Sequence, residues 1–176
     1  MSIASVFFDH SHHKLAVRGS GAPLDVLSFE GEEWLSSPFK YDIQFTSADK
    51  NIDPTTMLMQ DASLTLQAPV AEAFGVSVQQ PQRVIQGVVT AFTHLSTSKD
   101  ESRYALCLQP RLALLSRSHQ NRIYQDMSVP DIVDKILRDR HDMRGQDFVF
   151  TLAKAYPRRE QVMQYGEDDL RFISRL

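Results

Sequence analysis

Three histidines near the start of the sequence have side chains well suited to binding a metal ion. His10, His12 and His13 lie in the polar run DHSHHK. A structural or catalytic zinc site requires three or four ligands in a fixed geometry. Neither a cysteine nor an acidic pair completes such a set around these histidines. We therefore predict a solvated hairpin turn at this run, and no metal-binding residue in the chain.

Two clusters of carboxylates could perform acid–base or glycosidase chemistry if burial separated their pKa values. The first comprises Glu30, Glu32 and Glu33, and the second runs from Glu167 to Asp169. Nothing in the surrounding sequence implies burial of either cluster. We predict a solvated turn for the first cluster. The second is predicted to begin a helix, because negative charge is favourable at a helix N-terminus.

The single cysteine, Cys107, is the strongest nucleophile by residue type. A catalytic thiol needs an activating base and solvent access, and no motif around Cys107 provides either. We predict an inert, half-buried cysteine in a strand. The sequence also lacks the G-x-S-x-G, H-E-x-x-H and phosphate-binding glycine-loop motifs. We therefore predict no catalytic and no cofactor-binding residue, and expect that the chain is not an enzyme.

A locally basic stretch contains Arg111, Arg117, His119 and Arg122. Such a stretch could contact nucleic acid or an acidic protein partner. Nearby Arg103 and Tyr104 do not form a recognisable platform for stacking bases. We predict a solvated helix face here, and no nucleic-acid partner.

The composition places limits on the possible classes of protein. The chain has 176 residues, a formal net charge of −3 and 42% hydrophobic residues. These values are typical of a globular protein and give no global basic surface for nucleic acid or anionic membranes. One cysteine excludes an internal disulfide and suits a reducing cytoplasm. The N-terminus lacks the segments of a classical signal peptide, so export from the cell would need another route.

Strands are predicted throughout the first 111 residues. The clearest runs from Phe39 to Thr46, where apolar and polar residues alternate and place the apolar side chains on one face. One buried and one wet face indicate an antiparallel sheet. Shorter runs predict further strands at 3–8, 15–17, 24–29, 64–66 and 103–109, with a hairpin joining the first two, and a long strand is predicted at 84–95. The pattern is typical of a barrel or a sandwich.

Two segments of this β region are less regular. Residues 68–81 are predicted to form an irregular loop or a weak hairpin. Gly87 lies inside the strand predicted at 84–95, where glycine often marks a bulge or the tight bend that a barrel requires.

The pattern changes after Pro110 to a mixed α+β region. A short helical stretch is expected near 112–115, and strands at 121–125, 148–152 and 162–165. The best helix begins after Ser128, a favourable N-cap, and ends near Arg140. Gly166 is predicted to separate the last strand from a final helix. We predict a β domain at 1–111 and an α+β region at 112–176. The apolar face of the final helix is cut short without a C-cap, which indicates a fragment of a longer protein.

Four long blocks of the sequence resemble one family, in the expected order and over most of the chain. They are LDVLSFEGEEWLSSPFKYDIQFTSADKNID at 24–53, VIQGVVTAFTHL at 84–95, RYALCLQPRLALLSRSHQNRIYQDMSVPDIVDKIL at 103–137 and YPRREQVMQYGEDDLRFISRL at 156–176. The family is VgrG, the spike proteins of type VI secretion systems, which are similar to the baseplate hubs of contractile phages. Two departures are Gly166, where the family often has a longer polar residue, and residues 68–82, which fit only loosely.

The resemblance implies a mainly β fold: a tail-tube-like antiparallel β-barrel followed by an incomplete α+β region, with the second barrel and the needle absent. It implies a structural protein that forms a homotrimer at full length and adapts the trimeric spike to the hexameric tube protein Hcp. Baseplate components and a PAAR-type tip protein are the other implied partners, and the missing needle would contact the target membrane. The implied route is assembly in the bacterial cytoplasm and export through the type VI machine without a signal peptide.

Two alternatives remain open. The first is the baseplate hub of a contractile phage or phage-like particle, with the same fold in a different biological setting. The second, from another class, is a β module that binds cell wall or carbohydrate.

Overall fold

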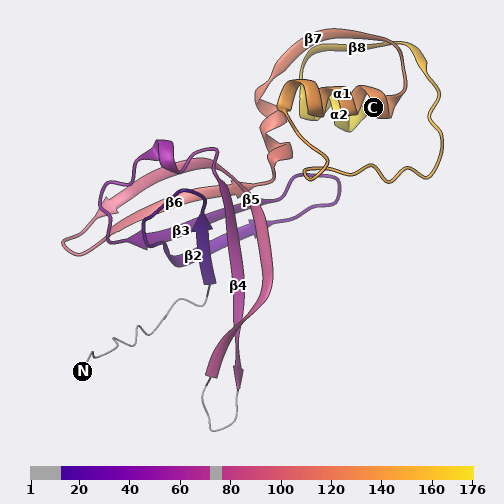
Figure 1. Cartoon of the computed structure of the whole chain (residues 1–176). Coiled ribbons are helices and arrows are strands. Elements are labelled where there is room, and N and C mark those ends of the chain that lie inside the picture. Colours follow the sequence, from indigo (N-terminus) through magenta and orange to yellow (C-terminus); the bar gives the residue numbers. More distant parts are fainter. Residues whose placement is uncertain (1–12, 72–76) are drawn as a thin grey trace. The chain divides into compact units, whose positions relative to one another are not determined.

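The computed structural model describes residues 13–71 and 77–176. The chain forms two compact units, Met1–Pro110 and Arg111–Leu176 (Figure 1). Among the described residues, no helix is both long enough and apolar enough to cross a membrane.

The first unit is a closed antiparallel barrel with the strand order β1-β2-β3-β6-β5-β4. Its strands are β1 (His13–Val17), β2 (Asp25–Glu32), β3 (Lys40–Ser47), β4 (Asp61–Ala71), β5 (Ser77–Thr97) and β6 (Ser102–Gln109). Pairing of β1 with β4 closes the barrel. A short 3-10 helix, η1 (Pro54–Thr56), precedes β4. The predicted mainly β fold with an antiparallel barrel is therefore confirmed.

The barrel core comes from the alternating strands that the sequence predicted. Tyr41, Ile43 and Phe45 of β3 are buried, whereas the residues between them face outward. Phe45 stacks on Tyr104 of β6 at 5.5 Å between ring centroids. Stacked rings and aliphatic side chains fill the interior and exclude water, which is the main source of stability in such a barrel.

Gly87 serves close strand packing rather than a bulge. A Cβ atom at this position would lie 2.4 Å from the backbone oxygen of Gln109. The register shifts of β5 occur elsewhere, between Leu66 and Gln67 of its partner β4, and between Val89 and Ala91 and between His94 and Ser96 within β5 itself. Of the bulge or tight bend predicted at Gly87, the bulge is wrong, and close approach of the backbone explains the glycine.

In the first unit, one predicted turn belongs to a strand, and the segment predicted as a loop or a weak hairpin is a hairpin. Glu30 and Glu32 lie in β2, so the charged turn predicted there is wrong; cross-strand pairing with β3 holds both residues extended. In the segment predicted as a loop or weak hairpin, Ala68 pairs with Gln80 in an extension of the β4–β5 hairpin. The strand predicted at 3–8 and the turn containing His10 and His12 lie outside the described residues.

The second unit packs helices against a two-stranded sheet. A 3-10 helix, η3 (Arg111–Arg117), leads into β7 (His119–Met127). An α-helix, α1 (Val129–Lys135), continues as a π-helix, η4 (Ile136–Arg140). Strand β8 (Arg159–Asp168) pairs with β7, and α2 (Asp169–Arg175) follows directly. Tyr124 of β7 and Phe172 of α2 stack within the small core of this unit.

Local capping explains where the helices begin. Ser128 is the predicted N-cap of α1, and it forms a complete capping box with Asp131. This arrangement satisfies two backbone donors that the first helical turn leaves free. The predicted helix that ends near Arg140 is confirmed, although its last turn is π rather than α.

Two further predictions for the second unit are wrong. Residues 148–152 form no strand, and with no β partner on either side their alternating pattern has no ladder to join. Gly166 does not end β8 but lies inside it with a φ of 60°, a conformation that glycine adopts without strain.

Candidate functional site: a buried carboxylate cluster in the second unit

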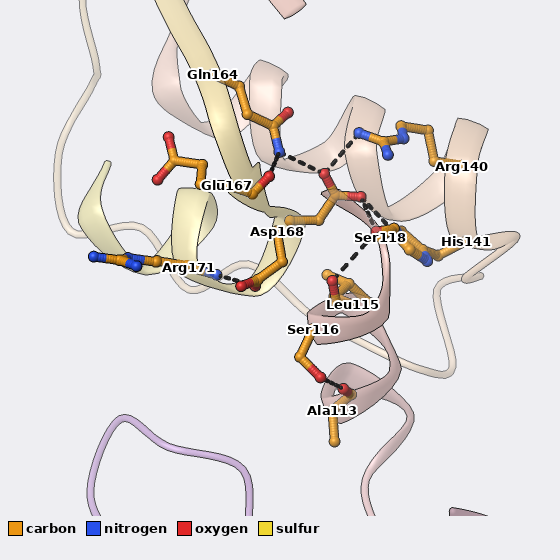
Figure 2. Close-up of polar contacts among 11 residues, drawn as sticks. Ala113, Leu115, Ser116, Ser118, Arg140, His141, Gln164, Glu167, Asp168 and Arg171 are labelled. Carbon is orange, nitrogen blue, oxygen red and sulfur yellow. Dashed lines mark hydrogen bonds and ion pairs between the residues drawn. The ribbon is translucent and has the colours of Figure 1, made fainter. Parts of the chain in front are cut away.

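Asp169, the first residue of α2, is a fully buried charged side chain. Four side chains donate hydrogen bonds to its carboxylate (Figure 2). Arg140 Nη1 and Gln164 Nε2 lie 2.6 and 2.8 Å from Oδ1. His141 Nε2 and Ser118 Oγ lie 2.7 and 2.9 Å from Oδ2. We call these five residues the Asp169 cluster.

The members of the cluster come from four separate parts of the second unit. Ser118 follows η3, Gln164 lies on β8, and Asp169 begins α2. Arg140 and His141 are adjacent at the end of the π-helix η4. Although they are consecutive, both side chains reach the carboxylate of Asp169. The cluster therefore ties together segments that are distant in the sequence.

The backbone at the start of α2 is equally constrained. The side chain of Asp168 is the N-cap and accepts a hydrogen bond from the backbone N–H of Arg171 at 2.8 Å. The backbone N–H of Asp169 donates to the carbonyl oxygen of Ser118 at 3.2 Å. Asp168 thus satisfies the helix end, which leaves Asp169 free to organise the interior.

The electrostatics keep Asp169 ionised. Burial by itself raises the pKa of this carboxyl, because it disfavours the charged form. Hydrogen bonds from Gln164, His141 and Ser118, together with the charge of Arg140, outweigh burial and hold the pKa below its ordinary value. The site is a compensated buried anion, whose stability depends on all its donors remaining in place.

The cluster contains a serine, a histidine and an aspartate, yet its geometry differs from that of a catalytic triad. In a triad the serine hydroxyl donates to the histidine, and the aspartate orients the histidine from behind. Here Ser118 and His141 both contact the same oxygen of Asp169. The two carboxylate oxygens have about four acceptor positions, and four donors fill them. No position is left for a substrate proton, so the arrangement fits a structural role.

Sequence reasoning found the position of Asp169 but missed its burial. The predicted helix start at Glu167–Asp169 is confirmed, with Asp168 as N-cap. The presence of two adjacent aspartates was the available signal, because one carboxylate is enough to cap a helix. The donors on η3 and η4 are too far away in the sequence to be connected with it.

The other residues singled out by type are not brought together. His13 lies on β1 and accepts a hydrogen bond from the backbone of Gln67 at 3.3 Å. Glu33 accepts one from Tyr41 Oη at 2.7 Å and pairs with Arg83, contacts that lower its pKa. In the described parts of the chain, no group of three or more His, Cys, Asp or Glu side chains is placed to hold a metal ion.

Cys107 and the basic stretch lie in different units. Cys107 is a free, buried thiol on β6, and burial raises its pKa, which favours the unreactive protonated form. Arg111 and Arg117 lie on η3, and His119 and Arg122 lie on β7. Only part of the basic stretch is therefore helical, because the strand begins two residues after η3 ends.

Comparison with known proteins decides the family. Residues 32–176, most of both units, match the family described as phage tail baseplate hub (GPD). The chain belongs to this family. The match covers β3 to β6 of the barrel and the whole second unit.

Similar proteins come from type VI secretion systems. The type VI secretion system spike protein VgrG5 of Pseudomonas aeruginosa is 31% identical over 169 residues, which are 96% of this chain and 20% of that protein. The actin cross-linking toxin VgrG1 of Vibrio cholerae is 32% identical over 162 residues, 87% of this chain and 14% of that protein. The chain spans about a fifth or less of these curated relatives.

A solved structure is more similar. The Escherichia coli c3393 protein is described as a type VI secretion component with structural similarity to the bacteriophage T4 tail proteins gp27 and gp5. It is 58% identical, with a TM-score of 0.79, and the match covers 93% of this chain and 42% of that one. The predicted resemblance to VgrG spike proteins and phage hubs is therefore confirmed.

Proposed function

We propose that this chain is the N-terminal hub part of a type VI secretion spike. The observation that carries the proposal is the 58% identity to a type VI secretion component over 93% of the chain, at a TM-score of 0.79. The first unit is the first tail-tube-like barrel of the hub. The second unit is part of the α+β region, and the second barrel and needle lie outside this sequence.

The role is mechanical. In the full-length protein, three copies form a trimer whose barrels give a ring that sits on the hexameric tube protein Hcp. A PAAR-type protein caps the far end, and other baseplate components surround the hub. A barrel with a packed interior and paired strands suits this role, because close-packed interiors have low compressibility and transmit strain. The protein assembles in the cytoplasm and leaves through the type VI machine.

We also propose that the chain has no catalytic function. All four acceptor positions of the Asp169 carboxylate are occupied by protein donors, and the Cys107 thiol is buried. The relative named as a toxin is far longer than the matched region, which covers 14% of it. We assign any toxic activity of such proteins to their other parts.

The baseplate hub of a contractile phage is the second candidate, and the match of residues 32–176 to the phage hub family favours it. The tube protein that binds separates the two candidates. We expect the purified chain to co-sediment with assembled rings of Hcp and not with a phage tube protein. Binding to the phage tube alone would transfer the assignment to a phage particle, and binding to neither would contradict the hub role. A glycan array should give no signal, whereas specific binding would favour the carbohydrate module.

A further inference from the structure

A groove of about 520 Å³ crosses the outer wall of the barrel over β2, β3, β6 and β5. The strand register arranges its side chains in rows across the sheet. One row holds Glu30, Asp42, Cys107 and Ala91, and the neighbouring row includes Ala105 and Thr93. The groove is therefore a continuous surface of four paired strands.

The floor of the groove is made of small side chains. Ala91, Ala105 and Cys107 lie at its centre, whereas Ile43 and Leu106 of the same strands fill the core. Alanine is depleted in strands because it packs poorly on a pleated surface. Because the alanine side chains on the outward face are short, another polypeptide can approach the backbone of the sheet closely.

The two charged side chains that line the groove are both negative. Glu30 and Asp42 are direct cross-strand partners, and like charges in that position are destabilising. Lys40 Nζ lies 2.6 Å from Asp42 Oδ2 and offsets that charge. Within residues 13–71 and 77–176, no ion pair to Glu30 is formed. The groove is therefore suited to a segment that combines a cation with apolar side chains.

The second unit exposes a segment of this kind. Residues 1–110 contain seven Lys and Arg against twelve Asp and Glu, whereas residues 111–176 contain twelve against ten. The first unit is thus acidic and the second weakly basic. At the start of the second unit, Arg117 and Arg122 are exposed. Leu112 and Ile123 in the same stretch are 38% and 58% exposed.

We propose that the groove receives the exposed part of β7 around Arg122 from a second copy of this chain, with Arg122 beside Glu30. The proposal rests on the hub function, which places several copies side by side in one ring. A contact between different surfaces of identical subunits repeats head to tail and closes a ring when the rotation allows it. Complementary charge would steer the two surfaces together and fix their register.

The test is sedimentation velocity of the 176-residue chain over a range of concentrations and salt. We expect self-association that weakens as salt rises, because added ions screen the charges. Glu30→Arg and Arg122→Glu should each weaken the association about tenfold, and the double variant should recover to within about threefold of wild type, as expected for a directly coupled pair. Circular dichroism verifies that each variant is folded.

Glu101→Arg is the matched control, since it makes the same charge change at an exposed position of the barrel outside the groove. Wild-type chain that stays monomeric up to its solubility limit would overturn the inference. So would equal effects of Glu30→Arg and Glu101→Arg, or a double variant no better than its parents. Binding of the wild-type chain to Hcp rings reports on the hub function separately. A chain that binds the rings but does not self-associate would contradict this contact and leave the hub function standing.

Discussion

The two units are stabilised by different kinds of contacts. The barrel buries a large set of apolar and aromatic side chains within strands that are paired on both sides, and the buried polar residues recorded for it carry no formal charge. The second unit has a two-stranded sheet, two smaller apolar clusters and one fully buried carboxylate. A two-stranded sheet is marginal by itself, so the smaller unit depends on helices and on the Asp169 cluster to hold it in shape.

This difference determines where each unit is vulnerable. Apolar packing is tolerant, because neighbouring side chains can partly relax into a lost volume. A compensated buried charge is less tolerant, because removal of one partner leaves the other uncompensated. Substitution of a single buried polar residue should therefore reveal the difference in stability between the two units more clearly than a substitution at the surface.

Replacement of Asp169 with alanine should have the largest effect. It would leave Arg140 buried without its anion, at a cost of about 3–5 kcal/mol in the stability of the second unit. Hydrogen exchange measured by mass spectrometry should show faster exchange in β7, β8 and α2, with barrel amides unchanged. Glu160→Ala, an exposed carboxylate of the same unit, is the control. Equal protection of the amides from exchange in variant and wild type would show that the Asp169 cluster does not stabilise the second unit.

Gly87→Ala should have the next largest effect on stability, and this effect should be confined to the barrel. The added Cβ would meet the backbone oxygen of Gln109 at 2.4 Å, so β5 and β6 must separate. Overpacking of this kind costs about 1–3 kcal/mol. Thermal unfolding should report the loss, while Gly21→Ala, with nothing within 4 Å of its Cβ, provides the comparison. A barrel as stable as wild type would show that the strands can shift freely.

Ser128→Ala should have a smaller effect, again limited to the second unit. It removes the capping box at the start of α1, and loss of such a cap costs about 1 kcal/mol. Ser128→Thr should retain most of the stability, because its hydroxyl can still accept from the backbone of Asp131 and donate to the Asp131 carboxylate. Urea denaturation followed by helical circular dichroism distinguishes the two variants, and identical midpoints would contradict a capping role.

Acid should produce the smallest difference between the units. The pKa of Asp169 is lowered by folding, so the unfolded chain binds its proton more readily. The contribution of Asp169 to the stability of the second unit is complete above the ordinary carboxyl pKa of about 4. It declines as the pH falls towards the lower pKa of the folded state. Hydrogen exchange corrected for its intrinsic pH dependence should show that the second unit opens before the barrel below about pH 4. In Asp169→Asn the second unit should open more easily at every pH, and the further loss that wild type shows below about pH 4 should be absent.

The sequence was most informative where local patterns coincide with the final contacts. Alternation in Phe39–Thr46 predicted β3 and its buried face, and Ser128 predicted the start of α1, because pleat and cap geometry involve only nearby residues. The prediction failed at 148–152, where alternation occurs without a strand partner. It also missed the cluster, because Ser118, Arg140 and Asp169 meet only after folding. The predicted division of the chain after residue 111 stays a prediction, part of the hub proposal.

The closed order of the barrel has a consequence for force. Among the described strands of the first unit, the first in the sequence, β1, lies between β2 and β4, and the last, β6, lies between β3 and β5. Each of these two strands is therefore paired on both sides, and neither is an outer edge that could be peeled away without breaking contacts to two neighbours. A part that is driven forward by a contracting machine would gain resistance to tearing from this connectivity alone.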